Sequence, residues 1–152
     1  MGEAYFYHLT HKPMEETLAM LLAKSLERGW RVAVRGTDRD RLDRLDRHLW
    51  LGDEAGFLPH GLAGGAHDTR QPVLLTTAKQ APNAPQCVIA IHGADLDPEE
   101  INGLERCCLL FDGGDEAAMT HARDQWRTLK TAGCSAQYWS EETGRWEMKA
   151  RT

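Results

Sequence analysis

Apolar residues recur along the chain with two different periods, which predict strands and helices in alternation. Residues 3–9 are rich in aromatic side chains and favour a β-strand. The next segment carries its large apolar side chains on one helical face, and Gly29 follows where helices commonly end. The members of that face are Met14, Leu18, Leu21, Leu22 and Leu26. Residues 30–35 then form a short apolar run that predicts a second strand.

A second amphipathic helix follows this strand. Leu42, Leu45 and Leu49 lie at helical spacing in a background of Asp and Arg, Thr37 is a plausible N-cap, and Gly52 is placed to end the helix. Strand, helix, strand and helix in this order predict parallel strands joined by crossover helices.

Two later runs lack any polar alternation. Residues 87–93 and 107–111 are almost wholly apolar, which is typical of strands buried on both faces. We therefore expect an α/β fold in three layers, with a mostly parallel or mixed central sheet and helices on both faces. This expected fold is like that of a mononucleotide-binding protein.

The remaining segments complete this prediction. Residues 72–77 form another strand, and Asp97 caps a short helix that begins with Pro98. A longer helix covers 116–132 and ends at Gly133. Residues 136–149 predict an edge strand or a hairpin with its turn near 142–144.

Length and composition favour one domain covering residues 1–152. Apolar residues make up 41% of the chain, yet no apolar run approaches the length of a membrane span. No charged segment followed by an apolar one begins the sequence, so we expect a cytoplasmic protein that does not bind membranes.

The cysteines and histidines do not predict a metal site. Cys87, Cys107, Cys108 and Cys134 form no C-x-x-C pair, and the central two lie in an apolar run, so we expect buried thiols. His8 and His11 stand three residues apart at a strand end, which puts them on different faces. We predict neither a metal nor a cofactor.

The residues also give an enzyme no recognisable site. The segment after the first strand, residues 8–13, has no glycine, so it does not match a phosphate-binding loop. The carboxylates of the second helix each have an Arg within helical reach, which favours a solvated paired face over an acid/base pair. No nucleophile lies in a known motif, and we expect no catalytic residue.

Large apolar side chains gather where the second helix ends. Trp50 closes the helix, Phe57 begins the apolar segment 57–59 that ends in a proline, and His60 opens a glycine-rich turn at 61–65. Aromatic residues on a helix end and its adjoining loop suit a surface on which another chain docks. The alternative is that Trp50 and Phe57 only cap the core.

Charge is unevenly distributed. The net charge is -5, although residues 123–152 hold six basic against four acidic side chains. On the late helix, Arg123, Arg127 and Lys130 form one stripe with Trp126 beside it. An aromatic ring within a basic stripe offers both apolar contact and cations, which suits an acidic peptide better than a long polyanion.

Several motifs together resemble the chi subunit of bacterial DNA polymerase III holoenzyme. They are FYHL, RVAV, LDRHLW, FLPHGLAGG, CVIAIHG and the helix that carries Trp126 and Arg127, and they occur in order over nearly the whole chain. The resemblance implies a mononucleotide-binding-like fold without a nucleotide site, and a non-catalytic adaptor. Such proteins link the clamp loader, through the psi subunit, to the acidic C-terminal tail of single-stranded DNA-binding protein.

The resemblance implies two binding sites. The tail would bind Arg123, Trp126, Arg127 and Lys130, and psi would bind Trp50, Phe57 and His60, so that DNA is contacted only indirectly. Relatives carry Tyr and Lys where this chain has Trp126 and Arg127, and a basic residue can occur at Met119. The C-terminus is also longer than in the shorter relatives. Two other functions stay open, a nucleotide-dependent enzyme on this fold and a direct nucleic-acid binder.

Overall fold

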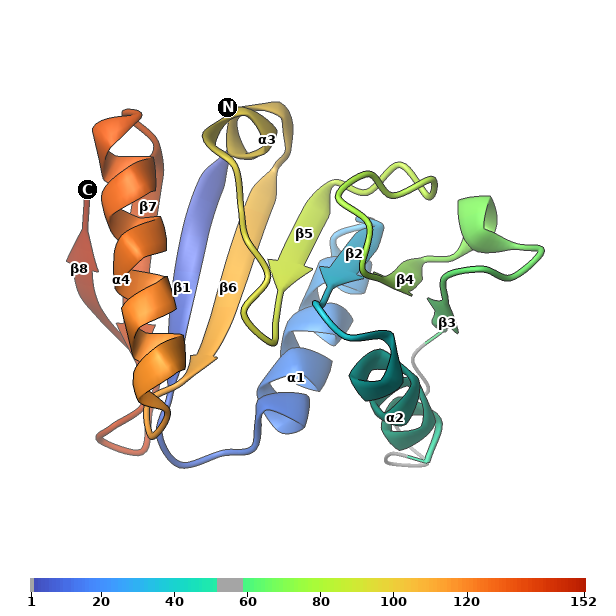
Figure 1. Ribbon diagram of the computed structural model, residues 1–152, viewed down its shortest axis with the longest axis horizontal. Coiled ribbons are helices and arrows are strands. Elements are labelled where there is room, and N and C mark those ends of the chain that lie inside the picture. The colour runs from blue at the N-terminus through green and yellow to red at the C-terminus, as the bar shows by residue number, and fades with distance from the viewer. Residues whose placement is uncertain (1, 52–58) are drawn as a thin grey trace.

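The computed structural model describes residues 2–51 and 59–152 (Figure 1). Its helices are α1 (Met14–Glu27), α2 (Arg39–Trp50), α3 (Pro98–Gly103) and α4 (Glu116–Thr131), with a 3-10 turn at Asp68–Arg70. Its strands are β1 (Glu3–Leu9), β2 (Val32–Arg35), β3 (Gly61–Leu62), β4 (Val73–Thr76), β5 (Cys87–Ala90), β6 (Arg106–Asp112), β7 (Ser135–Ser140) and β8 (Glu147–Arg151).

Within the described residues the strands form one eight-stranded sheet in the order β3-β4-β2-β5-β6-β1-β7-β8. All neighbouring pairs are parallel except β7 and β8, which form an antiparallel hairpin at one edge. Gly144 lies in the hairpin turn with a φ of 90°, a conformation that favours glycine. The predicted mostly parallel or mixed sheet and the predicted C-terminal hairpin are both confirmed.

The sheet separates two apolar clusters. Successive strand side chains point to opposite faces, so Phe6 and Tyr7 of β1 belong to different clusters. The cluster of Tyr7 is covered by leucines of α1 and α2, and that of Phe6 by Ile101 of α3 and Leu129 of α4. Figure 1 shows α4 beside β7 and β1, whereas α1 and α2 lie toward the other half of the sheet. Helices on both faces are therefore confirmed.

The two unalternating apolar runs form central strands, as predicted. Every residue of β5 is buried, and β6 is buried from Cys107 to Phe111. The four cysteines are buried free thiols, which confirms that prediction too. Burial raises the pKa of Cys107 well above its ordinary value and keeps this thiol neutral.

The predicted ends of α1 and α4 and the predicted Asp97 cap of α3 are confirmed, whereas the predicted N-cap of α2 is wrong. Gly29 and Gly133 have φ of 79° and each follows the C-cap residue of its helix, α1 or α4, as expected for helix ends. The N-cap of α2 is Asp38, whose side chain accepts a hydrogen bond from the Asp40 amide, 2.9 Å away. Thr37 was the wrong choice because its hydroxyl donates to the carbonyl of His92 at 2.8 Å.

Some element boundaries also differ from the predictions. The second strand begins at Val32, later than Trp30, and β5 ends at Ala90. His92 has a φ of 56°, so the chain has already left the extended conformation there. The expected turn at 61–65 contains the short strand β3, which pairs with β4. The predicted helix stop at Gly52 lies outside the described residues.

Among the residues that the structure describes, no helix is long and apolar enough to cross a membrane.

Candidate functional site

An open cavity of about 420 Å³ lies between α4 and the C-terminal hairpin. Its wall is mostly apolar and combines residues from β1, β6, α4, β7 and β8. The lining residues are Phe6, Phe111, Met119, Ala122, Arg123, Trp126, Tyr138, Lys149 and Ala150. We call it the α4 cavity.

Aromatic rings give the α4 cavity its shape. Trp126 stands edge-on to Phe6 at 5.2 Å and to Tyr138 at 6.2 Å between ring centroids. The hydroxyl of Tyr138 and Nδ1 of His8 are hydrogen-bonded at 2.6 Å, and the His8 ring stacks on Phe111. Edge-to-face packing and this hydrogen bond hold the rings in place, so the cavity is preformed for an apolar planar group.

Two cations line the same cavity. Arg123 is exposed on α4, one turn before Trp126. Lys149 comes from β8, where its Nζ lies 3.4 Å from Glu147 and 3.7 Å from Glu142. The carboxylates partly neutralise Lys149, which leaves Arg123 as the cation better placed to bind an anionic group beside the rings.

The structure brings together some of the residues predicted from the stripe on α4 and separates others. Arg123 and Trp126 both line the cavity, whereas Arg127 and Lys130 are exposed on α4 outside the lining. Arg127 is 75% exposed and lies 3.5 Å from Asp124 in an i,i+3 pair. The strand residues Phe6, Phe111, Tyr138 and Lys149 were missed, since no spacing within α4 points to them.

The second predicted site is only partly described. Trp50 is 50% exposed at the end of α2, so half of its side chain is open to solvent. The ring centroids of Trp50 and His60 are 4.3 Å apart. His60 is buried, and its Nε2 is hydrogen-bonded to the backbone carbonyl of Asp46 at 3.2 Å. The buried His60 ring therefore packs against the half-exposed ring of Trp50. Phe57 lies outside the described residues.

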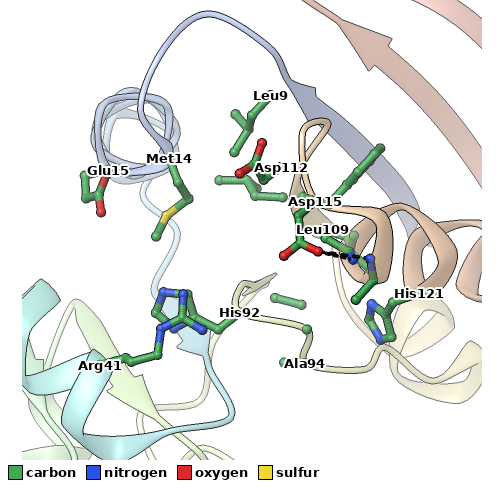
Figure 2. Close-up of a pocket in the computed structure, with 16 residues that line it drawn as sticks. Leu9, Met14, Glu15, Arg41, His92, Ala94, Leu109, Asp112, Asp115 and His121 are labelled. Carbon is green, nitrogen blue, oxygen red and sulfur yellow. Dashed lines mark hydrogen bonds between the residues drawn. The ribbon is translucent and has the colours of Figure 1, made fainter.

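A larger cavity, about 460 Å³, lies at the carboxyl ends of β1, β5 and β6, where α/β sheets commonly bind nucleotides (Figure 2). Its lining includes the carboxylates of Glu15, Asp112 and Asp115 and the guanidinium of Arg41. This excess of negative charge opposes phosphate binding.

The backbone amides that a phosphate would need are already bonded to carboxylates of this chain. Glu141 is buried, and its Oε1 accepts hydrogen bonds from the amides of Thr10, His11 and Lys12 at 3.0–3.1 Å. Asp115 accepts from the amides of Ala117 and Ala118 at the start of α4. The loop after β1 and the N-terminus of α4 thus carry their own anions.

The histidines at this edge of the sheet are structural neighbours and not a paired site. Burial and the nearby Arg41 lower the pKa of His92 to about 4, so its ring is neutral at pH 7. His8 belongs to β1 and bonds Tyr138, whereas His11 bonds the carbonyl of Glu142. Across the described parts of the chain, no group of three or more His, Cys, Asp or Glu could hold a metal ion.

Comparison with known proteins gives the family. A model of the family "DNA polymerase III chi subunit, HolC" matches residues 1–137. The probable DNA polymerase III subunit chi of Rickettsia prowazekii (strain Madrid E) is 23% identical over 96 residues, which cover 63% of this chain and 58% of that protein. Because the family model covers most of the sequence, the chain belongs to the family of DNA polymerase III chi subunits.

Proposed function

We propose that the protein is a non-catalytic adaptor of the replisome. One surface binds the acidic C-terminal tail of single-stranded DNA-binding protein, and a second surface binds the psi subunit of the clamp loader. The single observation that supports this most is the α4 cavity, in which Trp126 and Arg123 meet. We expect this tail to end in Pro-Phe, so that its last residue has both a ring and a free carboxylate.

The proposed bound state follows from this pairing. The terminal ring of the peptide enters the aromatic wall formed by Phe6, Trp126 and Tyr138. Its carboxylate lies against Arg123, whose planar guanidinium can donate two parallel hydrogen bonds. Acidic residues earlier in the peptide face Arg127 and Lys130, which extend the stripe along the exposed side of α4.

The α4 cavity and the exposed cations of α4 should contribute unequally to the affinity for the peptide. The ring displaces water from an apolar cavity, whereas Arg127 is mostly exposed and already close to Asp124. Exposed charge pairs contribute about 1 kcal/mol or less and are screened by salt. The ring and Arg123 therefore dominate affinity, and the outer cations mainly set its dependence on salt.

Binding of the tail peptide should depend mainly on Trp126 and Arg123. Trp126→Ala should weaken binding of an acidic peptide ending in Phe by about 2 kcal/mol, roughly thirtyfold, because it removes a central aromatic anchor. Arg123→Ala should weaken it by a similar amount, and Arg127→Ala by less. Fluorescence anisotropy of a labelled peptide measures all three.

Arg70→Ala is the matched control, since Arg70 is also exposed but lies in the 3-10 turn, away from α4. A peptide without its terminal Phe should bind none of the proteins. Equal affinity in the wild type and in the Trp126 and Arg123 variants would place the tail elsewhere.

The second prediction concerns the surface around Trp50. Trp50→Ala should weaken association with the psi subunit by about 2 kcal/mol or more, as for an interface anchor, with little change in thermal stability because half of the side chain is exposed. Met148→Ala removes a similarly exposed apolar side chain on β8 and should leave psi binding unchanged. Loss of melting temperature with psi binding retained would instead assign Trp50 to the core.

A further inference from the structure

A row of alternating guanidinium groups and aromatic rings lies on the face of the sheet opposite the α4 cavity. Arg28 lies over the ring of Trp30 at 5.0 Å, and Arg106 lies between Trp30 at 5.3 Å and Tyr5 at 4.2 Å. Tyr5 stacks in turn on Trp139, with 6.4 Å between centroids and 26° between planes. We call these five residues the aromatic–cation row.

The row forms one wall of a cavity of about 260 Å³. Lys24 lies in the last turn of α1, and Arg28 is the exposed C-cap residue that follows the helix. Trp146 closes the cavity from the C-terminal hairpin, edge-on to Tyr7 with 5.2 Å between ring centroids. Within the described part of the chain the lining contains three cations and no carboxylate. An anionic ligand is therefore favoured, despite the net negative charge of the whole protein.

The guanidinium of Arg106 has a hydrogen-bond donor to spare. Its Nε is buried and has no hydrogen-bond partner among the described residues. On the two neighbouring strands Glu3 and Cys87 lie opposite Arg106 in register, and the Glu3 carboxylate accepts a hydrogen bond from Gln137 at 3.1 Å. A buried donor of a charged group is costly unless it is satisfied, so a ligand that brings an acceptor oxygen is stabilised there.

Rings and guanidinium planes in one row favour a ligand that is itself planar. Every nucleobase has a π-face, and stacking on aromatic or Arg planes together with nearby cations for phosphate is the usual mode of single-strand binding. An acidic peptide matches the cations, but it does not supply successive planar groups. We propose that this cavity binds single-stranded DNA, with a base against Trp139 and Trp146 and adjacent phosphates at Lys24, Arg28 and Arg106.

The α4 cavity and the cavity of the aromatic–cation row lie on opposite faces of the sheet. Phe6 and Tyr138 face the α4 cavity, whereas Tyr5, Tyr7 and Trp139 face the second one, because strand side chains alternate. The tail peptide and single-stranded DNA would thus bind opposite faces without competing. Trp139 and Trp146 also lie beyond residue 137, where the match to the family ends.

The test measures anisotropy of a labelled oligothymidylate of about 15 nucleotides with the full chain, from low to physiological salt. Lys24→Glu/Arg28→Glu should weaken binding about tenfold or more. Both residues are exposed at the C-terminal end of α1, so the fold should be retained. Arg44→Glu/Arg47→Glu on α2 makes the same change in net charge and should have a much smaller effect.

Two further measurements separate stacking from charge. Trp139→Leu should weaken binding of the oligonucleotide, and Trp139→Phe should restore most of it because a ring is retained. For three neutralised phosphates, the logarithm of the binding constant should fall against the logarithm of salt concentration with a slope of about -2. The Lys24→Glu/Arg28→Glu variant should give a shallower slope.

The controls distinguish this proposal from the adaptor function. The Lys24→Glu/Arg28→Glu variant should bind the acidic tail peptide as the wild type does, and Trp126→Ala should bind the oligonucleotide normally. No binding of the oligonucleotide at low salt would overturn the proposal, as would equal losses in both charge-reversal variants. Loss of the peptide in the Lys24→Glu/Arg28→Glu variant would assign the cavity to a peptide instead. Equal affinity for thymidine monophosphate and the oligonucleotide would assign it to a free nucleotide.

Discussion

Replacing Arg35 by alanine should lower the free energy of unfolding by about 3–5 kcal/mol, as expected when one member of a buried ion pair is removed. Arg35 ends β2, and its guanidinium bonds both carboxylate oxygens of Glu100 at 2.8 and 3.0 Å. The same group donates to the carbonyls of Lys79 and Asp95. The side chains of the pair are only 8% and 15% exposed. Alanine would therefore leave the Glu100 carboxylate poorly solvated, without its cation and with the Asp97 amide as a remaining donor.

Urea unfolding followed by circular dichroism measures this loss, and the chain offers a matched control. Arg47 pairs with Asp43 at 3.1 Å, but the Arg47 side chain is 73% exposed, so Arg47→Ala should cost about 0.5 kcal/mol or less. The double variant Arg35→Met/Glu100→Gln should lose less free energy of unfolding than the sum of the losses in Arg35→Met and in Glu100→Gln. The double variant leaves no charge buried, whereas each single variant leaves one. Similar losses for Arg35→Ala and Arg47→Ala would contradict the prediction.

The elements of the fold could be predicted where one short segment contains the whole signal. The leucines of α1 and the unalternating runs of β5 and β6 depend only on local periodicity and burial, and these predictions are confirmed. The N-cap of α2 could not be chosen in this way. Thr37 and Asp38 are both good capping residues, and the choice depends on the contact between Thr37 and His92, 55 positions later.

The candidate peptide site shows the same division. The pairing of Arg123 with Trp126 follows from their spacing on one helix, so the sequence indicated it. Phe6, Phe111 and Tyr138 come from β1, β6 and β7, which are neighbours only because of the order of the strands in the sheet. No pattern within a single element reveals which strands lie beneath α4.

Glu141 is the residue that sequence reasoning missed most completely. It stands in a polar segment, EETG, that predicts an exposed turn, yet it is buried and holds the loop after β1. Its three donors are amides about 130 positions earlier, so the burial depends on a long-range contact. The Glu141 carboxylate thus occupies the three amides with which a bound phosphate would otherwise have to hydrogen-bond.

Glu141→Ala should therefore destabilise the protein by about 3 kcal/mol, since three backbone donors lose a charged acceptor. Although burial alone would raise it, hydrogen bonds from Lys12, His11 and Thr10 lower the pKa of Glu141 below its ordinary value of 4.5. The stabilisation is then complete above pH 4.5 and is lost as the pH falls through the lowered pKa. Thermal unfolding measured between neutral and acid pH should show this acid-dependent loss in the wild type, and much less of it in Glu141→Gln.

A small carboxylate should partly replace the missing side chain. Without Glu141, the converging amides of Thr10, His11 and Lys12 form an anion site of the kind that backbone N–H groups make elsewhere. Acetate should raise the melting temperature of Glu141→Ala by mass action, with little effect on the wild type, whose site already holds its own carboxylate. Glu142→Ala is the matched control because Glu142 is an exposed neighbour, and it should respond to acetate as the wild type does. An equal rise in all three proteins would mean that acetate acts on the surface in general and that the Glu141 carboxylate does not stabilise this loop.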